Sequence, residues 1–244
     1  MTGNSTDEYF FAQFADTWWS QDSQMSGLAS FQRPRFAYFD THIAEWAGKR
    51  VLDVGCGGGF TTEFLSARGA SVTGVDPSTS LIDVARRHAE QTGKHIEYSV
   101  GTAEALPFPD AAFDIVTCVD VLEHVADPAR SISEIARVLT PGGVFCFDTI
   151  NRTVRSRIVM IWIPEYLLAV GTKGVHLWKD FITPSELRGY LADAGLVGDG
   201  RLRGLTILGK RRGKLVIKET GDLSCTYIGV ARKPHRRKED RTHG

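Results

Sequence analysis

The stretch VLDVGCGGGF, Val51 to Phe60, decides the fold of this chain together with Asp76, the acid that ends SVTGVD. The stretch opens with an apolar strand of the kind that is buried on both faces of a parallel sheet. Three glycines at alternate positions then allow a sharp turn and a close approach to a ligand: Gly55, Gly57 and Gly59. A carboxylate at the end of the second strand can accept both hydroxyls of a ribose. The pattern therefore predicts a binding site for a nucleoside-containing cofactor.

The spacing of the glycines separates two kinds of cofactor. A dinucleotide site requires G-x-G-x-x-G, whose third glycine would stand at position 60, and that residue is Phe60. The G-x-G-x-G spacing with a later acid is instead similar to the S-adenosylmethionine site of class I methyltransferases. We therefore predict S-adenosyl-L-methionine as the cofactor, and a nicotinamide-linked oxidoreductase is disfavoured. The residues predicted to bind it here are Gly55, Cys56, Gly57 and Asp76, with Cys56 expected to pack rather than to act as a nucleophile.

The composition is that of an ordinary globular domain. At 244 residues the chain can form one α/β domain with a large core, and 42% hydrophobic and 24% charged residues are average values. The 29 basic and 29 acidic residues cancel, so net charge does not favour nucleic acid as a partner. The four cysteines form no C-x-x-C pair, which argues against a zinc or disulfide framework and favours a reducing, cytoplasmic location.

Strands and helices alternate through the middle of the chain. Strands are expected at 50–55, 71–76, 95–100, 113–118 and 144–149, and helices at 59–68, 80–91 and 128–139. Further helices are expected at 7–19, 33–46 and 183–194, the last with a capping box of Thr183 and Glu186. Segments near 202–208 and 224–231 are expected to complete the sheet. The order predicts an α/β fold with a Rossmann-like, doubly wound parallel sheet.

The chain is expected to divide into five parts. These are an N-terminal helical cap (1–48), the cofactor-binding core (49–150), an inserted helical lid after strand five (151–182), the C-terminal part of the sheet (183–231) and a disordered tail (232–244). The longest uninterrupted apolar run of the lid, Ile158 to Pro164, is far shorter than the roughly 20 residues of a spanning helix. A lid over the active site and an interfacial segment on a bilayer both remain open, and one segment can be both.

A basic cluster follows the lid. Between Arg201 and Lys218 there is no acidic residue, and the basic residues are Arg201, Arg203, Lys210, Arg211, Arg212, Lys214 and Lys218. Such a cluster is either a solvated face or a contact for anionic lipid headgroups. Peripheral contact with an anionic membrane, on its inner face, is therefore one hypothesis for this protein.

Several segments outside the glycine turn resemble one family, the ubiquinone-biosynthesis O-methyltransferases. They are FADTWW, VTCVDVLEHVADP, LTPGGVFCFDTINR and KGVHLWKDFITPSEL, and the similarity runs from about Phe14 to about Ala231. Members of this family methylate phenolic hydroxyls of polyprenylated quinone precursors. The resemblance implies a class I methyltransferase fold, a methyl transfer to oxygen and a lipophilic phenolic or catechol substrate.

The resemblance also assigns residues to the cofactor. Arg35 matches a family arginine near the cofactor, which implies that it faces the methionine carboxylate. Thr102 and Ala103 match the loop that borders the adenine, and Val119 matches a position beside the cofactor after the fourth strand.

Asp120, Glu123 and His124, within VDVLEHV, are the candidate catalytic group. Some eukaryotic members of the family hold a divalent cation through an acid, a Glu and a His at these positions, which implies a Mg²⁺ site here. On a helical turn the three side chains would share one side, and carboxylates suit a hard cation. Without a metal, His124 is the candidate general base, with Asp120 as the second catalytic candidate, because a phenol of pKa about 10 needs only modest help from an imidazole of pKa about 6.5. A pocket wall and a partner at a helix start are the alternative roles of His124.

Other functions remain open. The fold and the cofactor site are equally compatible with a natural-product methyltransferase that modifies oxygen or nitrogen of a small molecule. A catalytically silent, methyltransferase-like binding protein is a further alternative, against which the intact glycine turn and Asp76 argue. The sequence identifies neither the methyl acceptor nor the oligomeric state.

Overall fold

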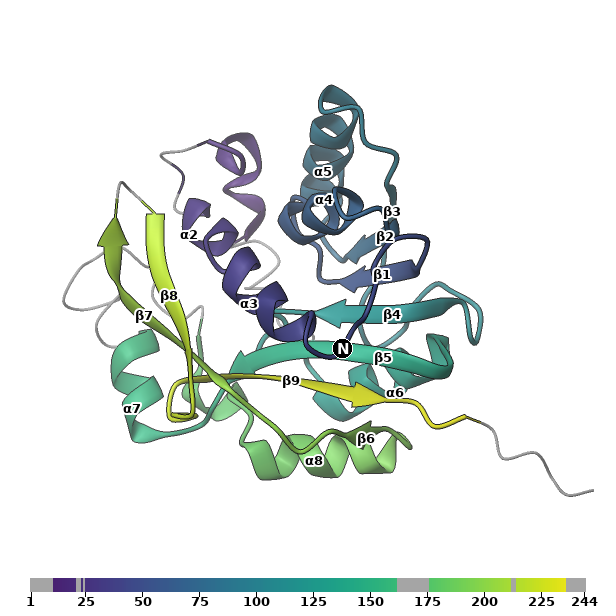
Figure 1. The fold of residues 1–244 in the computed structure, drawn as a ribbon. Coiled ribbons are helices and arrows are strands. Elements are labelled where there is room, and N and C mark those ends of the chain that lie inside the picture. Colours follow the sequence, from purple (N-terminus) through teal and green to yellow (C-terminus); the bar gives the residue numbers. More distant parts are fainter. Residues whose placement is uncertain (1–10, 21–22, 24, 162–175, 212–213, 236–244) are drawn as a thin grey trace, which may run out of the picture.

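The computed structural model describes residues 11–20, 23, 25–161, 176–211 and 214–235. A twisted sheet forms the centre, helices cover both of its faces, and a two-stranded hairpin stands beside it (Figure 1). None of the helices in the described ranges is long and apolar enough to cross a bilayer.

The central sheet has seven strands. Their order is β3 (Glu97–Val100), β2 (Ser71–Asp76), β1 (Arg50–Val54), β4 (Phe113–Cys118), β5 (Leu139–Ile150), β9 (Thr226–Arg232) and β6 (Val197–Gly198). The first five are parallel, whereas β9 runs antiparallel to both β5 and β6. The order reverses between β1 and β4, as in a doubly wound sheet, so the predicted fold class is confirmed.

The helices form one layer on each face of the sheet (Figure 1). One layer holds α3 (Gln32–Phe39), α4 (Phe60–Ser66) and α5 (Thr79–Gln91), and the other holds α6 (Pro128–Val138) and α8 (Pro184–Asp193). Successive residues of β1 serve the two layers, since Val51 joins the core cluster of Phe36 and Leu65 while Leu52 joins that of Ile132 and Leu187. Both faces of the central strands are therefore buried, as the apolar run requires. Short helical segments complete the fold: the 3₁₀ helices Ala15–Thr17 and Trp178–Asp180, α2 (Ser26–Ala29) and α7 (Val154–Ser156).

The helix starts follow the capping residues of the sequence. The Ser78 hydroxyl accepts from the N–H of Leu81 at the start of α5, and Asp127 begins α6 in the same way. At α8 the Thr183 side chain and the Glu186 side chain each accept from the other residue's N–H, so the predicted capping box is confirmed.

The N-terminal helices are shorter than predicted. The helix expected over 33–46 ends at Phe39, because Thr41 Oγ1 donates to the Tyr38 carbonyl and Trp46 Nε1 donates to Asp40 Oδ1 at 2.7 Å. These bonds hold residues 40–46 as turns. Of the helix expected over 7–19, residues 7–10 lie outside the described ranges and Phe11 and Ala12 are helical. Residues 13–19 consist of turns and the 3₁₀ helix Ala15–Thr17.

The expected strand near 202–208 does not complete the main sheet. It begins β7 (Gly204–Arg211), which pairs antiparallel with β8 (Lys214–Thr220) in a separate hairpin. A backbone bridge to the main sheet lies just before β7, between Arg203 and Ile228, and Thr226 Oγ1 of β9 donates to the Leu205 carbonyl of β7. The two strands lie two residues apart in sequence and pair locally, while the short β6 takes the edge of β9. The strand expected near 224–231 is β9, and it is confirmed.

Two of the predicted boundaries fall on partly described segments. Residues 162–175, most of the expected lid, and residues 236–244 of the expected tail lie outside the described ranges. The tail was expected to begin at 232, but Arg232 belongs to β9 and Lys233 Nζ donates to the carbonyls of Ala136 and Leu139, both at 2.7 Å. The expected start of disorder at 232 is therefore wrong for these two residues.

Candidate active site

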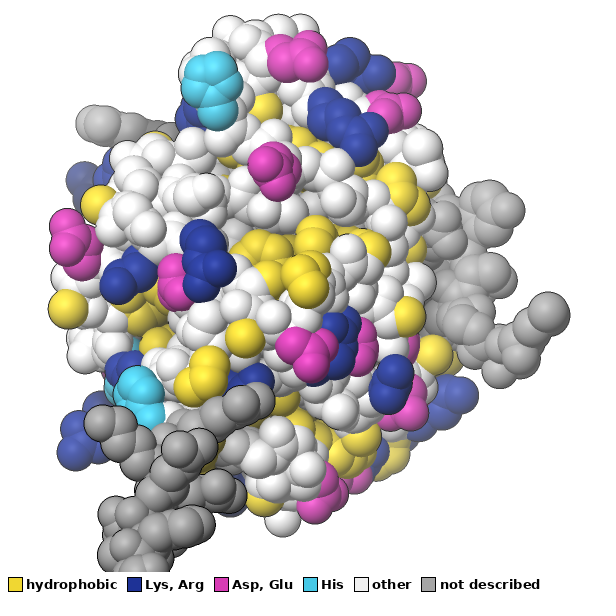
Figure 2. Space-filling model, turned by 90° about the vertical axis from the view of Figure 1, so that its right-hand side faces the viewer, with side chains coloured by type: hydrophobic (Ala, Val, Ile, Leu, Met, Phe, Trp, Pro, Cys, Tyr) yellow, Lys and Arg dark blue, Asp and Glu magenta, His cyan; other side chains and the backbone are white. Residues whose placement is uncertain are grey.

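Four residues form a row at the carboxyl ends of the central strands. The register pairs Val54 with Val75 and with Cys118, and it pairs Cys118 with Phe147. One residue further along each strand stand Gly55, Asp76, Val119 and Asp148. The row crosses the β1/β4 switch point, which is where open α/β sheets bind their ligands. Figure 2 shows the opposite side, where β1, β4 and β5 begin, and there basic and acidic side chains are interspersed.

The glycine turn after β1 has the predicted conformation. Gly55, Gly57 and Gly59 all have positive φ angles, 71°, 51° and 99°. A Cβ atom on Gly55 would lie 2.3 Å from Val121 Cγ2, so a side chain is excluded there by contact as well as by backbone conformation. The turn therefore brings bare backbone to the row.

Asp76 is buried beside this turn. Its Oδ2 accepts from the Gly57 N–H and its Oδ1 from the Ser78 N–H, both at 2.9 Å. Ser78 rather than Asp76 caps α5. The two backbone bonds hold the carboxylate at the end of β2, beside the glycine turn.

Arg35 of α3 reaches the row from the adjacent helix layer. Its side chain is fully buried, with Nε 2.5 Å from Asp148 Oδ2 and Nη2 2.6 Å from Asp120 Oδ2. Burial alone would lower the pKa of Arg35, but the charges of Asp120 and Asp148 raise it above its ordinary value. The third nitrogen, Nη1, is buried and has no hydrogen-bond partner within the described chain. A buried cationic donor without a partner fits an anionic group of a ligand.

Asp148 connects Arg35 to the turn after β4, a role that the sequence analysis missed. Its Oδ1 accepts from the Asp120 N–H at 2.7 Å while Oδ2 holds Arg35. Burial raises the pKa of Asp148 to about 7, although Arg35 acts to lower it. Asp120 itself has a φ of 56°, in the left-handed region that non-glycine residues rarely adopt. The position of Asp148 at the end of a predicted parallel strand was the signal that could have identified it.

The predicted helical turn of Asp120, Glu123 and His124 is wrong. The left-handed Asp120 is followed by a hydrogen-bonded turn from Val121 to His124, so the segment is not a helical turn. Asp120 pairs with Arg35, and buried Glu123 accepts from Thr149 Oγ1 at 2.8 Å. Among the described residues no group of three His, Cys, Asp or Glu side chains is arranged to hold a metal ion. The Mg²⁺ hypothesis for these three residues therefore has no support from their arrangement.

His124 lies apart from the row, among aromatic rings. Its ring centroid is 5.5 Å from that of Phe11 and 5.1 Å from that of His176. Burial raises the pKa of the neighbouring Glu123, and the charge of His124 partly offsets this effect. His176 borders residues 162–175, the part of the expected lid that lies outside the described ranges. His124 therefore lies between the N-terminal segment, through Phe11, and the C-terminal end of the expected lid, through His176.

The remaining predicted cofactor residues occupy different surroundings. Ala103 is buried and Thr102 is exposed in the loop after β3, and Val119 packs with the core on the α3 side. Cys56 packs with Ile82 of α5, and burial raises the pKa of its thiol well above the ordinary value. Cys56 therefore contributes its backbone to the turn rather than a reactive thiolate.

Two tryptophans that the sequence analysis did not place lie on the glycine turn. Trp19 Nε1 donates to the Gly58 carbonyl at 2.9 Å, and the Trp18 ring contacts Gly57 and Gly58. Both belong to FADTWW. Trp19 and Gly58 are 39 residues apart in the chain. No local sequence pattern predicts a contact between residues that far apart.

Comparison with known proteins agrees with this geometry. Residues 52–147 match the family described as methyltransferase domain. A SAM-dependent methyltransferase from Thermotoga maritima has a TM-score of 0.64 at 19% identity, covering 93% of this chain and 99% of that one. A protein from Pyrococcus horikoshii has a TM-score of 0.63 at 20% identity, covering 89% and 95% of the two chains. At such identities these two structures show that the fold is shared.

Relatives with higher identity identify the family. The ubiquinone biosynthesis O-methyltransferase of Idiomarina loihiensis is 39% identical over 225 residues, which are 92% of this chain and 91% of the relative. The enzyme of the same name from Coxiella burnetii is 43% identical over 186 residues, 76% of this chain and 79% of the relative. The chain therefore belongs to the ubiquinone biosynthesis O-methyltransferase family and is an S-adenosylmethionine-dependent O-methyltransferase.

Proposed function

We propose that this enzyme methylates a phenolic hydroxyl of a polyprenylated catechol, a quinone precursor. The observation that supports this acceptor most strongly is the 39% identity along 92% of the chain to a relative named for ubiquinone biosynthesis. The geometry adds the row of Gly55, Asp76, Val119 and Asp148 at the switch point of the sheet, where a cofactor can bind. A natural-product phenol or amine is the alternative acceptor.

We assign each part of the cofactor to residues of the row or to residues next to it. Asp76 accepts hydrogen bonds from the ribose hydroxyls, and the loop of Thr102 and Ala103 borders the adenine. Val119 lines the cofactor site after β4. Arg35 Nη1, the buried donor without a partner, binds the carboxylate. When bound, S-adenosylmethionine supplies an electrophilic methyl group. The protein contributes alignment of the acceptor oxygen with that group, which is worth several orders of magnitude in rate.

The hydroxyl proton is transferred to His124. Asp120 is held by Arg35, and Glu123 is buried against Thr149, so both acids serve to position the turn rather than to accept the proton. Imidazole is the common general base at neutral pH. A Mg²⁺-assisted route would need three ligating side chains in one group, and the described residues contain no such group.

The experiment that tests the function is a comparison of acceptors with a labelled methyl donor. A polyprenyl catechol, a soluble catechol and an aromatic amine are each offered, and the product is assigned as O- or N-methylated. We expect the polyprenyl catechol to give the highest kcat/KM and an O-methylated product, with turnover unaffected by a chelator. A preference for the amine or the soluble phenol would replace the proposed acceptor, and loss of turnover with the chelator that Mg²⁺ restores would establish the metal route.

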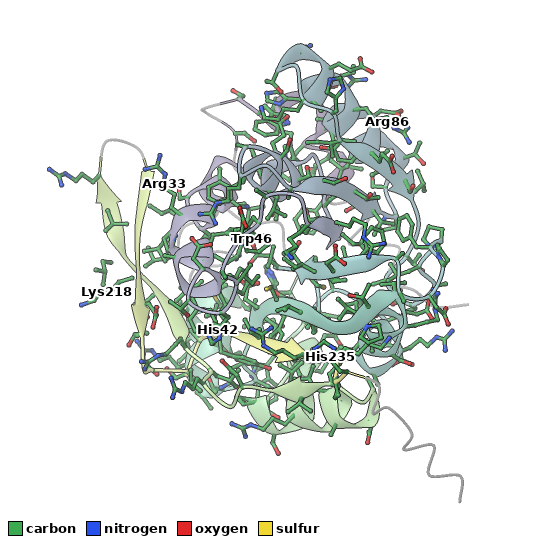
Figure 3. The ribbon with its side chains drawn as sticks, turned by 45° about the vertical axis from the view of Figure 1, so that its right-hand side comes forward. Arg33, His42, Trp46, Arg86, Lys218 and His235 are labelled. Atoms are coloured by element: carbon green, nitrogen blue, oxygen red, sulfur yellow. The ribbon has the colours of Figure 1, made fainter. Side chains whose placement is uncertain are left out.

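We further propose that the enzyme is cytoplasmic and contacts an anionic membrane through the hairpin and the lid. Ile207, Leu208 and Val216 of the hairpin are 49%, 63% and 39% exposed, and Lys218 projects from β8 away from the main sheet (Figure 3). Ile158 and Val159, next to the undescribed part of the lid, are also exposed. Apolar side chains beside basic ones are typical of interfacial segments.

Co-sedimentation with vesicles tests this contact. We expect binding to phosphatidylglycerol vesicles that weakens as salt rises, because each basic residue near the surface adds about 1 kcal/mol of attraction that salt screens. A Leu208→Ser/Lys218→Glu variant should bind severalfold more weakly. Arg86→Glu, on the distant α5, serves as the matched control of charge. Equal sedimentation of the two variants, or no binding by the wild type, would reject the contact.

A further inference from the structure

The paired tryptophans before α2 use their indole groups differently. Trp19 has a complete set of contacts, since its Nε1 donates to the Gly58 carbonyl and its ring stacks on His88 at a centroid distance of 3.6 Å. Trp18 is 5% exposed and stacks on Phe60 at 5.5 Å. Trp19 therefore holds the N-terminal segment to the turn by a hydrogen bond, whereas Trp18 packs its ring on Gly57 and Gly58.

The contact of Trp18 with the turn explains a glycine that the backbone does not require. A Cβ atom on Gly58 would lie 2.5 Å from Trp18 Cδ1 and 2.7 Å from Trp18 Nε1. Gly58 is not among the glycines of positive φ, unlike its neighbours Gly57 and Gly59. Its missing side chain thus makes room for the indole, and the indole belongs to the surroundings of the turn.

The indole N–H of Trp18 is a buried donor with no hydrogen-bond partner in the described part of the chain. Buried donors are almost always paired in native structures, because they lose their bonds to water. The contrast with Trp19, whose N–H is paired, makes the position of Trp18 distinctive. A donor of this kind beside the cofactor turn indicates a bond to the cofactor.

The order of strands indicates which part of the cofactor this donor meets. From β3 through β2 to β1 there follow in order the loop of Thr102 and Ala103, assigned to the adenine, then Asp76, assigned to the ribose, and then the glycine turn on which Trp18 lies. A ligand laid along this direction brings its amino-acid end to the turn. We propose that Trp18 Nε1 donates a hydrogen bond to the carboxylate of S-adenosylmethionine, as a binding residue additional to Arg35. The inference rests on the cofactor placement given under the proposed function.

Binding of two cofactor fragments tests the inference without turnover. S-adenosylhomocysteine carries the carboxylate, and 5′-methylthioadenosine carries the same nucleoside without it. We expect Trp18→Phe to raise the Kd of S-adenosylhomocysteine by about tenfold or more, as for loss of a hydrogen bond to a charged group. The Kd of 5′-methylthioadenosine should rise far less, so the ratio of the two constants increases. Trp19→Phe, whose N–H binds the protein, should leave that ratio at the wild-type value.

An unchanged ratio in Trp18→Phe would overturn the bond to the carboxylate, and tighter binding would show that Trp18 blocks the site instead. If Trp18→Phe does not fold, Gly58→Ala provides a second variant, because its methyl group displaces the indole while keeping the N–H in the chain. It should raise the same ratio. Absence of any S-adenosylhomocysteine binding by the wild type would contradict the cofactor assignment itself, a separate outcome.

Discussion

The Arg35→Met variant should lose roughly 3–5 kcal/mol of unfolding free energy, the cost of leaving buried charges without their partner. Arg35 is fully buried and holds Asp148 at 2.5 Å and Asp120 at 2.6 Å. Methionine fills much of the same space but compensates neither acid. Urea denaturation at pH 8 measures the loss. Weaker binding of S-adenosylhomocysteine should accompany it, because Nη1 is lost as well.

The pH dependence of this loss identifies its cause. Burial already raises the pKa of Asp148 to about 7, and removing Arg35 raises it further. A carboxyl group whose folded pKa lies above its unfolded pKa loses stability as pH rises between the two values. The deficit of Arg35→Met relative to the wild type should therefore widen as pH rises above about 7. Asp148→Asn in the same chain should recover part of it. If the difference in unfolding free energy between Arg35→Met and the wild type is constant from pH 6 to pH 8.5, the loss arises from packing alone.

Replacement of His124 by Asn should lower kcat by roughly a hundredfold or more, the usual contribution of a general base. The affinity for S-adenosylhomocysteine should stay within about twofold, because His124 lies among Phe11 and His176 and outside the cofactor row. Initial rates with a catechol acceptor and calorimetry of the cofactor product measure the two quantities. Selective loss of kcat is the expected signature.

The difference in kcat between His124→Asn and the wild type should become smaller as pH rises toward about 10, because a phenol then ionises without a base. His176→Asn is the matched control, since it removes the neighbouring imidazole and should cost less. If His124→Asn keeps kcat within threefold of the wild type, the base is another group. Equal losses in both variants would instead indicate that the two rings act as a unit.

The glycine turn and the position of Asp76 could be predicted from the sequence because their signals are local. An apolar strand, glycines and a terminal acid specify Val51 to Phe60 and Asp76 separately, and parallel strands then bring their carboxyl ends to one edge. The strand register then aligns these ends, because Val54 pairs with Val75 on one side and with Cys118 on the other. Caps such as the Thr183–Glu186 box were equally local and equally predictable.

The parts that the sequence did not predict depend on contacts across long stretches of chain. Arg35 and Asp148 pair across more than a hundred residues, and no local pattern connects them. Asp120 was expected on a helix, but its N–H bond to Asp148 and its ion pair hold it in the left-handed region. The sequence of β7 predicts a strand but not its partner. Its partner is β8, the next strand along the chain, and not a strand of the main sheet.

Calorimetric titration of S-adenosylhomocysteine into the wild type and Asp76→Ala tests the central claim most directly. The wild type should bind, and the variant should bind at least tenfold more weakly, since charge-assisted bonds to the ribose are lost. Asp83→Ala, an exposed aspartate of α5, is the matched control and should bind as the wild type does. Unfolding transitions at similar temperature would show that all three fold. Equal affinity of Asp76→Ala and the wild type would contradict the claim that this row is the cofactor site.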